Sequence, residues 1–192
     1  MKIVLSGGPS AGKTSIAKTL VQHYGSKLVV IPEAASLLYT AGFPRRSYQE
    51  AILRQQQAIF QVQRSQEFIY QQEAKGKVVV CDRGTLDSLA FFNEVESRDF
   101  LEYFRTTKEK ELAKYDAVIY LHTPDMAQYD QASNPVRTED FEAARKLDQR
   151  FMEAWKDHPN FVSIQQTEDF LDKILAVRKN LDLVLSQSQP KA

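Results

Sequence analysis

The residues with the clearest chemical purpose lie near the start of the chain, between Gly7 and Thr14. Gly7 is followed after four residues by Gly12, Lys13 and Thr14. Glycines in this pattern let the backbone curl around an anion with successive N–H groups pointing inward. The lysine can reach the β and γ phosphates of a nucleoside triphosphate, and the threonine hydroxyl can bind the accompanying magnesium ion. The spacing therefore predicts a phosphate-binding P-loop.

The sequence on either side of this loop supplies the elements that such a site needs. An apolar strand is expected over Lys2–Ser6, and a helix is expected from about Lys13 to Tyr24. The amino end of that helix adds unpaired N–H donors and a positive dipole end at the loop. A Gly-rich turn that fits the pattern by chance would lack this context. The residues expected to hold the triphosphate are Gly7, Gly8, Pro9, Ser10, Ala11, Gly12, Lys13, Thr14 and Ser15.

Four further apolar runs alternate with helical segments, a pattern that predicts a parallel sheet. The strands are expected over 28–31, 77–81, 116–121 and 161–164, and the helices over about 48–74, 85–92, 99–114, 138–157 and 170–185. The expected fold class is α/β, a P-loop NTPase with a five-stranded parallel sheet. We expect one domain over 1–187, a helical lid at about 124–150, and a mobile tail over 188–192.

Two carboxylates follow predicted strands at the edge where the P-loop lies. Glu33 comes after the second strand, and Asp82 and Arg83 come after the third. Ligands of open α/β sheets bind beyond the carboxyl ends of the strands, so these side chains are candidate catalytic groups. Asp82 could bind magnesium with Thr14 or accept a proton, or it could cap the helix predicted at Thr85. Glu33 could be the base or reach magnesium through water, or it could be a first-turn glutamate favoured by the helix dipole.

Arginines in the predicted lid could stabilise the negative charge that builds up on a transferring phosphoryl group. The candidates are Arg137, Arg145 and Arg150. Arg145 and Arg150 are five residues apart and point away from each other on one helix, so we select Arg137 and Arg145. The alternative is a solvated amphipathic helix whose acidic residues pair with these arginines.

The long helix predicted over about 48–74 carries a polar residue within its apolar stripe. Gln55 falls on the stripe formed by Ile52, Ile59, Val62 and Ile69. A glutamine that points inward needs hydrogen-bond partners. It could read a base or a ribose, although a bond to the backbone is favoured.

The composition limits the class of protein. Of the 192 residues 43% are apolar and 26% are charged, and 25 basic residues balance 25 acidic ones. This balance argues against a nucleic-acid binder that depends on a broad basic field. The single cysteine, Cys81, is expected in the core and suits a reducing compartment. Because no apolar run has the length of a membrane span and no room for a signal peptide precedes the P-loop, we expect a soluble cytoplasmic protein.

Four short motifs, taken together, are more specific than the P-loop alone. They are Ser-Gly-Gly-Pro-Ser-Ala-Gly-Lys-Thr at 6–14, Ile-Pro-Glu-Ala-Ala at 31–35, Cys-Asp-Arg-Gly-Thr-Leu-Asp at 81–87 and Asn-Pro-Val-Arg-Thr-Glu-Asp at 134–140. In this order they resemble the NadR-type P-loop family, which joins the nicotinamide riboside kinase domain of NadR with the TRPL-translocation-defect type of nucleotide-binding protein. The resemblance implies a carboxylate near the acceptor hydroxyl at Glu33, an Asp–Arg pair at Asp82 and Arg83, and a mobile arginine-bearing lid. It also implies a layout similar to deoxynucleoside and thymidylate kinases, a kinase-like three-layer α/β/α fold with a five-stranded parallel sheet of order 2-3-1-4-5 and a helical lid.

The sequence therefore predicts an ATP-binding protein that uses magnesium to transfer the γ-phosphate to a small, hydroxyl-bearing, nucleoside-like metabolite. The expected partners are the triphosphate and this acceptor, with no nucleic acid and no membrane span. The alternative is an ATP- or GTP-regulated binding protein or NTPase that switches contact with a protein or an anionic lipid. A closed acceptor pocket between Glu33, the 48–74 helix and Asp82 would favour the kinase, because a kinase must exclude water.

Overall fold

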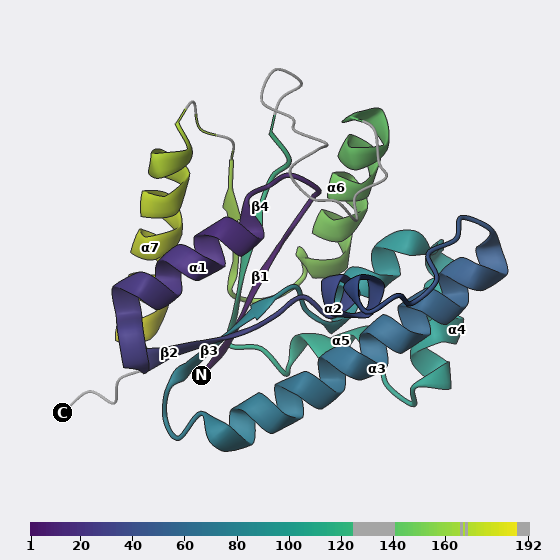
Figure 1. Cartoon of the computed structure of the whole chain (residues 1–192), viewed down its shortest axis with the longest axis horizontal. Coiled ribbons are helices and arrows are strands. Elements are labelled where there is room, and N and C mark those ends of the chain that lie inside the picture. The colour runs from purple at the N-terminus through teal and green to yellow at the C-terminus, as the bar shows by residue number, and fades with distance from the viewer. Residues whose placement is uncertain (125–140, 166, 168, 188–192) are drawn as a thin grey trace.

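The strands of this protein form one parallel sheet. The structure is a computed structural model, and it describes residues 1–124, 141–165, 167 and 169–187. The strands are β1 (Lys2–Gly7), β2 (Leu28–Ile31), β3 (Val78–Asp82), β4 (Ala117–Leu121) and β5 (Phe161–Ile164). Their order in space is β2-β3-β1-β4-β5, so the predicted α/β fold and strand order are confirmed (Figure 1).

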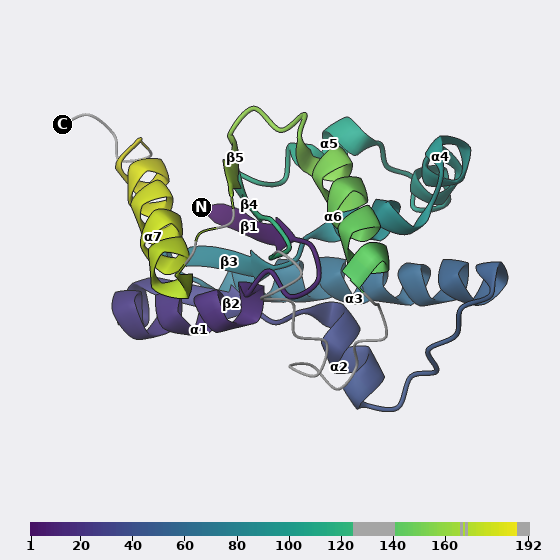
Figure 2. The same ribbon diagram turned by 90° about the horizontal axis from the view of Figure 1, so that it is seen from above.

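Helices cover both faces of the sheet. They are α1 (Lys13–Tyr24), α2 (Ala34–Thr40), α3 (Gln49–Glu73), α4 (Glu94–Tyr103), α5 (Lys108–Leu112), α6 (Phe141–Trp155) and α7 (Phe170–Gln187), with 3₁₀ segments η1 (Gly25–Lys27) and η2 (Thr85–Phe91). α1 and α7 lie together on one face, and α3 to α6 lie with η2 on the other (Figures 1 and 2). Within the described part of the chain, no helix has both the length and the apolar character needed to cross a membrane.

The central strand β1 is buried on both faces, as the middle strand of a three-layer fold must be. Ile3 and Leu5 pack into the core shared with α1 and α7. Val4 points to the other side, into the core that contains Phe60 and Trp155. Because side chains alternate along a strand, one short apolar run serves two separate cores.

The strand ends that carry the predicted site lie level with one another. Leu5 pairs with Asp82 between β1 and β3, and Ile31 pairs with Cys81 between β2 and β3. On the other side of β1, Gly7 pairs with Leu121 of β4. The segments that follow β1, β2, β3 and β4 therefore leave the sheet at one edge, where ligands of such sheets bind.

Two of the predicted helices differ in the structure. The segment predicted as one helix over 99–114 contains two, because α4 ends at Tyr103 and Arg105 takes a left-handed φ of 52°. α5 then begins after Thr107, whose side chain accepts a hydrogen bond from the N–H of Lys110. The short helix α2 was not among the predicted helices, although the alternative role given to Glu33 assumed a helix at this place.

The predicted helix after β3 is the 3₁₀ segment η2, and Thr85 does not cap it. The Thr85 hydroxyl instead donates to Glu111 Oε2 at 2.8 Å. Asp87 performs the local role, because its Oδ2 accepts from the N–H of Gly84 at 2.8 Å. A buried carboxylate from α5 therefore takes up the threonine hydroxyl that could otherwise have capped this segment.

The fully buried face of α3 is largely polar, so the predicted apolar stripe is only partly right. Ile52, Ile59 and Val62 are half-buried. Ile69, expected in the core, is 52% exposed. The buried residues of α3 are Gln55, Gln56, Phe60, Gln63 and Glu67.

Buried ion pairing explains this polar face. Glu67 accepts from Lys2 Nζ at 2.7 Å and from the Tyr115 hydroxyl at 2.7 Å. It also accepts from Gln63 Nε2 at 3.0 Å. Polar groups can be buried when their hydrogen bonds are made, and here the partners come from distant parts of the chain.

Replacing Glu67 by alanine should lower the free energy of unfolding by about 3–5 kcal/mol, because it leaves the Lys2 ammonium group buried without its counter-ion. The matched control is Glu50→Ala on the same helix, which breaks an ion pair with Arg54 whose side chains are 62% and 64% exposed. That change should cost less than about 1 kcal/mol. Urea unfolding followed by circular dichroism measures both losses, and equal losses would contradict this account of the α3 face.

Candidate active site

The loop between β1 and α1 has the backbone that the P-loop pattern predicts. Gly12 takes a left-handed φ of 85°, and its carbonyl accepts the first helical hydrogen bond of α1, from Ile16 at 2.9 Å. The Lys13 side chain is buried and turns back along the loop, where Nζ donates to the carbonyls of Gly7 at 2.9 Å and Gly8 at 2.6 Å. The ammonium group therefore lies against the backbone that would surround a phosphate.

The first turn of the loop is fixed by a carboxylate from α6. The N–H of Gly8 donates to Asp148 Oδ1 at 3.0 Å. A Cβ atom at Gly8 would lie only 2.0 Å from Thr123 Oγ1 and 2.5 Å from Asp148 Oδ1, so glycine is required here for space. Asp148 also accepts from the Tyr120 hydroxyl at 2.9 Å and lies 3.1 Å from His122 Nδ1.

Asp148 was not predicted as a site residue, because the sequence suggested only a surface partner for the lid arginines. Burial alone would raise the pKa of Asp148, but hydrogen bonds from His122 and Tyr120 hold it below its usual range. The carboxylate is therefore charged at neutral pH.

Thr14 and Asp82 are brought together as the magnesium prediction requires. The Thr14 hydroxyl donates to Asp82 Oδ2 at 2.8 Å. Asp82 is buried, and its Oδ1 has no hydrogen-bond partner among the described residues. Burial, followed by the negative charge of Glu33, raises the pKa of Asp82. A hydroxyl beside a carboxylate oxygen that lacks a donor is a set of hard oxygen ligands, which fits magnesium.

Glu33 and Arg83 form an ion pair between the ends of β2 and β3. Arg83 Nε donates to Glu33 Oε1 at 2.6 Å, and the Ser36 hydroxyl donates to Glu33 Oε2. Burial alone would raise the pKa of Glu33, but the guanidinium group and the Ser36 hydroxyl hold it below its usual value. Glu33 is therefore ionised, while the pKa of neighbouring Asp82 is raised. Two carboxyl groups whose pKa values are shifted in opposite directions are typical of acid–base sites.

The backbone of Arg83 is held in an uncommon conformation for a residue other than glycine, with a φ of 73°. Its N–H donates to the Leu5 carbonyl at 3.1 Å, and its carbonyl accepts from Gln63 Nε2 at 3.1 Å. Gln63 is thus the link between the polar face of α3 and the site. Residues in such conformations persist where surrounding contacts enforce them, often at functional sites.

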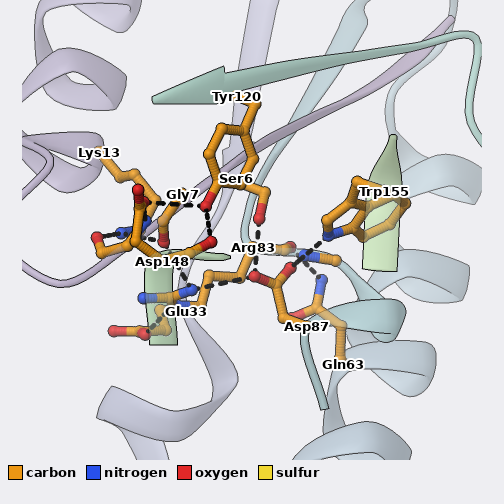
Figure 3. Close-up of polar contacts among 12 residues, drawn as sticks. Ser6, Gly7, Lys13, Glu33, Gln63, Arg83, Asp87, Tyr120, Asp148 and Trp155 are labelled. Carbon is orange, nitrogen blue, oxygen red and sulfur yellow. Dashed lines mark hydrogen bonds and ion pairs between the residues drawn. The ribbon is translucent and has the colours of Figure 1, made fainter. Parts of the chain in front are cut away.

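The guanidinium group of Arg83 lies at the centre of the polar contacts in Figure 3. Besides Glu33, it donates through Nη1 to the Gly7 carbonyl at 3.1 Å and to Asp87 Oδ1 at 2.9 Å. The Phe151 ring of α6 packs over it at 4.5 Å. The arginine therefore connects the P-loop, the end of β2, η2 and α6.

Asp87 accepts two further hydrogen bonds from buried side chains next to Arg83. Its Oδ1 accepts from the Ser6 hydroxyl at 2.7 Å, and its Oδ2 accepts from Trp155 Nε1 at 3.2 Å. Asp87 was not among the predicted site residues, since neither of these partners is close in the chain. It positions Arg83.

A cavity of about 900 Å³ joins the P-loop to a wall formed by α2 and α3. Glu33 and Arg83 also line it: Arg83 Nη1 donates to the carbonyl of Gly7 in the P-loop, and Glu33 immediately precedes α2. The wall away from the P-loop is mixed. It contains the aromatic and aliphatic side chains of Tyr39, Ile52, Ile59, Phe60, Phe91, Leu147 and Phe151, together with polar residues that include Arg45, Arg46, Ser47, Gln55 and Gln56. A cavity of this size and lining is typical of a small-molecule site.

Two adjacent glutamines of α3 have different roles. Gln55 holds the neighbouring loop, because its Oε1 accepts from the N–H of Arg46 at 2.8 Å and its Nε2 donates to the Arg46 carbonyl at 2.9 Å. The favoured backbone role of Gln55 is confirmed. Gln56 is also buried and lines the cavity, and its side chain has no hydrogen-bond partner within the described ranges. Gln56 was missed because it lies off the predicted stripe.

The sequence matches a protein-family model described as an AAA domain over residues 2–173. The chain belongs to this AAA domain family. A search among curated proteins finds no significant match.

Members of two kinase groups have a similar fold. Deoxyadenosine kinase from M. mycoides with bound dATP superimposes with a TM-score of 0.66 at 15% identity, covering 95% of this chain and 100% of the kinase chain. Thymidylate kinase from Ehrlichia chaffeensis gives a TM-score of 0.62 at 17% identity, covering 96% of this chain and 98% of the other. The AAA domain of this chain therefore has a kinase-like P-loop fold.

The two selected lid arginines are not both placed by the structure. Arg137 lies outside the described residues. Arg145 is on the exposed side of α6, and the residues of α6 that line the cavity are Leu147 and Phe151. A role for Arg145 in the site stays a prediction.

Polyphosphate binding at this P-loop should be coupled to proton uptake by Lys13. Burial, and to a lesser extent the charge of Arg83, lowers the pKa of Lys13 to about 7. A bound polyphosphate favours the charged amine and raises that pKa, so the affinity for ATP should fall as pH rises above 7, by up to about tenfold per pH unit.

Titration calorimetry at pH 7.5 and 8.5, in two buffers of different ionisation enthalpy, measures both the affinity and the protons taken up. The control is Lys13→Arg, whose guanidinium group stays charged and should remove the slope. If the ATP affinity of the unaltered protein did not change with pH, the assignment of proton uptake to Lys13 would be contradicted.

Proposed function

We propose that this protein is a magnesium-dependent kinase that transfers the γ-phosphate of ATP to a hydroxyl group of a small, nucleoside-like acceptor. The observation that carries the proposal is the continuous cavity that joins the P-loop to the α2–α3 wall, with Glu33 and Arg83 in its lining. A triphosphate on the P-loop and a molecule against that wall would meet at these two side chains. The kinase-like fold supports the same reading.

The donor side consists of residues 7–15, which would surround the phosphates with backbone N–H groups and the Lys13 ammonium group. Thr14 and Asp82 would hold magnesium, because their oxygens adjoin and Asp82 Oδ1 has no donor among the described residues. Magnesium held by these two residues would supply positive charge that partly neutralises the phosphates.

On the acceptor side, Glu33 is the group that receives the proton. It is ionised, and Arg83 Nε fixes one of its oxygens at 2.6 Å. The acceptor oxygen attacks the γ-phosphorus, the bond between that phosphorus and the ADP oxygen breaks, and the hydroxyl proton passes to Glu33. The guanidinium group of Arg83 stabilises the charge on the transferring group.

The lining of the cavity supports a nucleoside-like acceptor. Its aromatic and aliphatic side chains suit a flat ring, and the amide of Gln56 is available to read a polar edge. An amide both donates and accepts hydrogen bonds, as do the edges of nucleobases and nicotinamide. The resemblance to the NadR-type family makes nicotinamide riboside one acceptor to test.

A panel of nucleosides and vitamin ribosides should contain a compound that raises ADP release above the basal ATPase rate. Glu33→Gln should lower that stimulated rate by about 10²- to 10⁴-fold, because the amide cannot take up the proton. ATP affinity should stay nearly unchanged, because the phosphates are bound by residues 7–15 and the amide oxygen can still accept the hydrogen bond from Arg83 Nε. Lys13→Ala should abolish ATP binding. No stimulation across the panel would favour a nucleotide-regulated binding protein, and near-normal ATP affinity in Lys13→Ala would contradict the donor site.

For the stimulating compound, Gln56→Ala should raise KM by about 3- to 10-fold, the cost of one or two uncharged hydrogen bonds. The control is Gln57→Ala, which removes the next glutamine of α3, one that accepts from Arg54 Nη1 at 3.2 Å. Steady-state kinetics measures both variants. An equal KM for Gln56→Ala and the unaltered protein would exclude Gln56 from the acceptor site.

A further inference from the structure

A large aromatic side chain lies over the P-loop from the side opposite the acceptor cavity. Phe170 opens α7, and a Cβ atom at Gly12 would lie 2.5 Å from its Cε2 and 3.1 Å from its Cζ. The edge of the ring is therefore in contact with the backbone of Gly12, next to Lys13. The side chain is nevertheless 45% exposed, so its packing leaves much of its apolar surface in contact with water.

The position of this ring is set by the rest of α7. Val177 and Leu181 are fully buried, and Phe170 lies on the same helical stripe, seven residues before Val177. The first turn of α7 is fixed by Lys173, which is buried and donates from Nζ to the His122 carbonyl at 2.8 Å. The stripe thus continues past the end of the core and onto the P-loop.

The geometry indicates which part of a ligand would reach the ring. α7 lies beside α1, on the other side of the P-loop from α2 and α3 (Figures 1 and 2). Phe170 is not part of the cavity lining, whereas Gly12, Lys13 and Thr14 are. A triphosphate on the loop that points its γ-phosphate toward Glu33 must direct its other end, the ribose and base, away from the acceptor cavity.

We propose that Phe170 is the surface on which the base of the donor nucleotide stacks, an inference that rests on the proposed function. Stacking does not require a particular pattern of donors and acceptors on the base, because every base has a π face. The donor site would therefore accept both adenine and guanine nucleotides, with Phe170 contributing to the affinity for each.

The test compares nucleotides with a ligand that has no base. The affinities of MgATP, MgGTP and magnesium tripolyphosphate are measured by titration calorimetry for the unaltered protein, Phe170→Ala, Phe170→Leu and Phe170→Tyr. Loss of one stacking contact should weaken both nucleotides by roughly 5- to 150-fold in the alanine and leucine variants. Tripolyphosphate affinity should not change, and tyrosine should retain nucleotide affinity.

The matched control is Leu171→Ala, which removes a neighbouring α7 side chain that is 57% exposed and should change none of the three affinities. Unchanged nucleotide affinity in Phe170→Ala and Phe170→Leu would overturn the inference. An equal loss for tripolyphosphate would also overturn it, because the ring would then only shape the loop. If the unaltered protein binds neither ATP nor tripolyphosphate, the proposed function itself fails, and this inference fails with it.

Discussion

The arrangement of this site depends on one half-buried guanidinium group that contacts three structural elements. Arg83 is shared by Glu33 after β2, Gly7 at the start of the P-loop and Asp87 in η2. A charge in this environment is tolerated only when its hydrogen bonds are made, so each partner is held where Arg83 requires it. The three carboxylates of Glu33, Asp82 and Asp87 outnumber the two cationic side chains of Lys13 and Arg83, so a magnesium ion that enters with the phosphates would offset negative charge at the site.

This constraint accounts for features that local sequence preferences do not. Arg83 has a left-handed backbone conformation because its N–H donates to the Leu5 carbonyl and its own carbonyl accepts from Gln63 Nε2. The segment after it forms a 3₁₀ helix, in which Asp87 can reach both Gly84 and Arg83. The polar face of α3 follows as well, since Gln63 must be oriented by Glu67 to reach the site. Local conformation here is determined by the charges that the fold has to pair.

The sequence is informative where chemistry depends on neighbours in the chain or on the ends of strands. The P-loop pattern is local, and the rule that ligands bind beyond parallel strands was enough to select Glu33, Asp82 and Arg83. It is uninformative where the partners are distant. Lys2 and Glu67 are 65 residues apart, and Gly8 and Asp148 are 140 apart. No periodicity within one segment can reveal such pairs, so the buried face of α3 and the role of Asp148 emerge only in three dimensions.

Two glycines of the P-loop, Gly8 and Gly12, show how local backbone requirements and contacts with distant helices act on the same loop. Gly12 has a positive φ, a backbone conformation that favours glycine. In addition, the Phe170 ring of α7 occupies the space that a Cβ atom at Gly12 would need. Gly8 does not have a positive φ, and it is excluded from having a side chain by Thr123 and by Asp148 of α6. The loop is therefore shaped from both ends by helices that come late in the chain. A P-loop motif specifies a backbone that can surround phosphate, and its setting between α6 and α7 determines which other groups reach that phosphate.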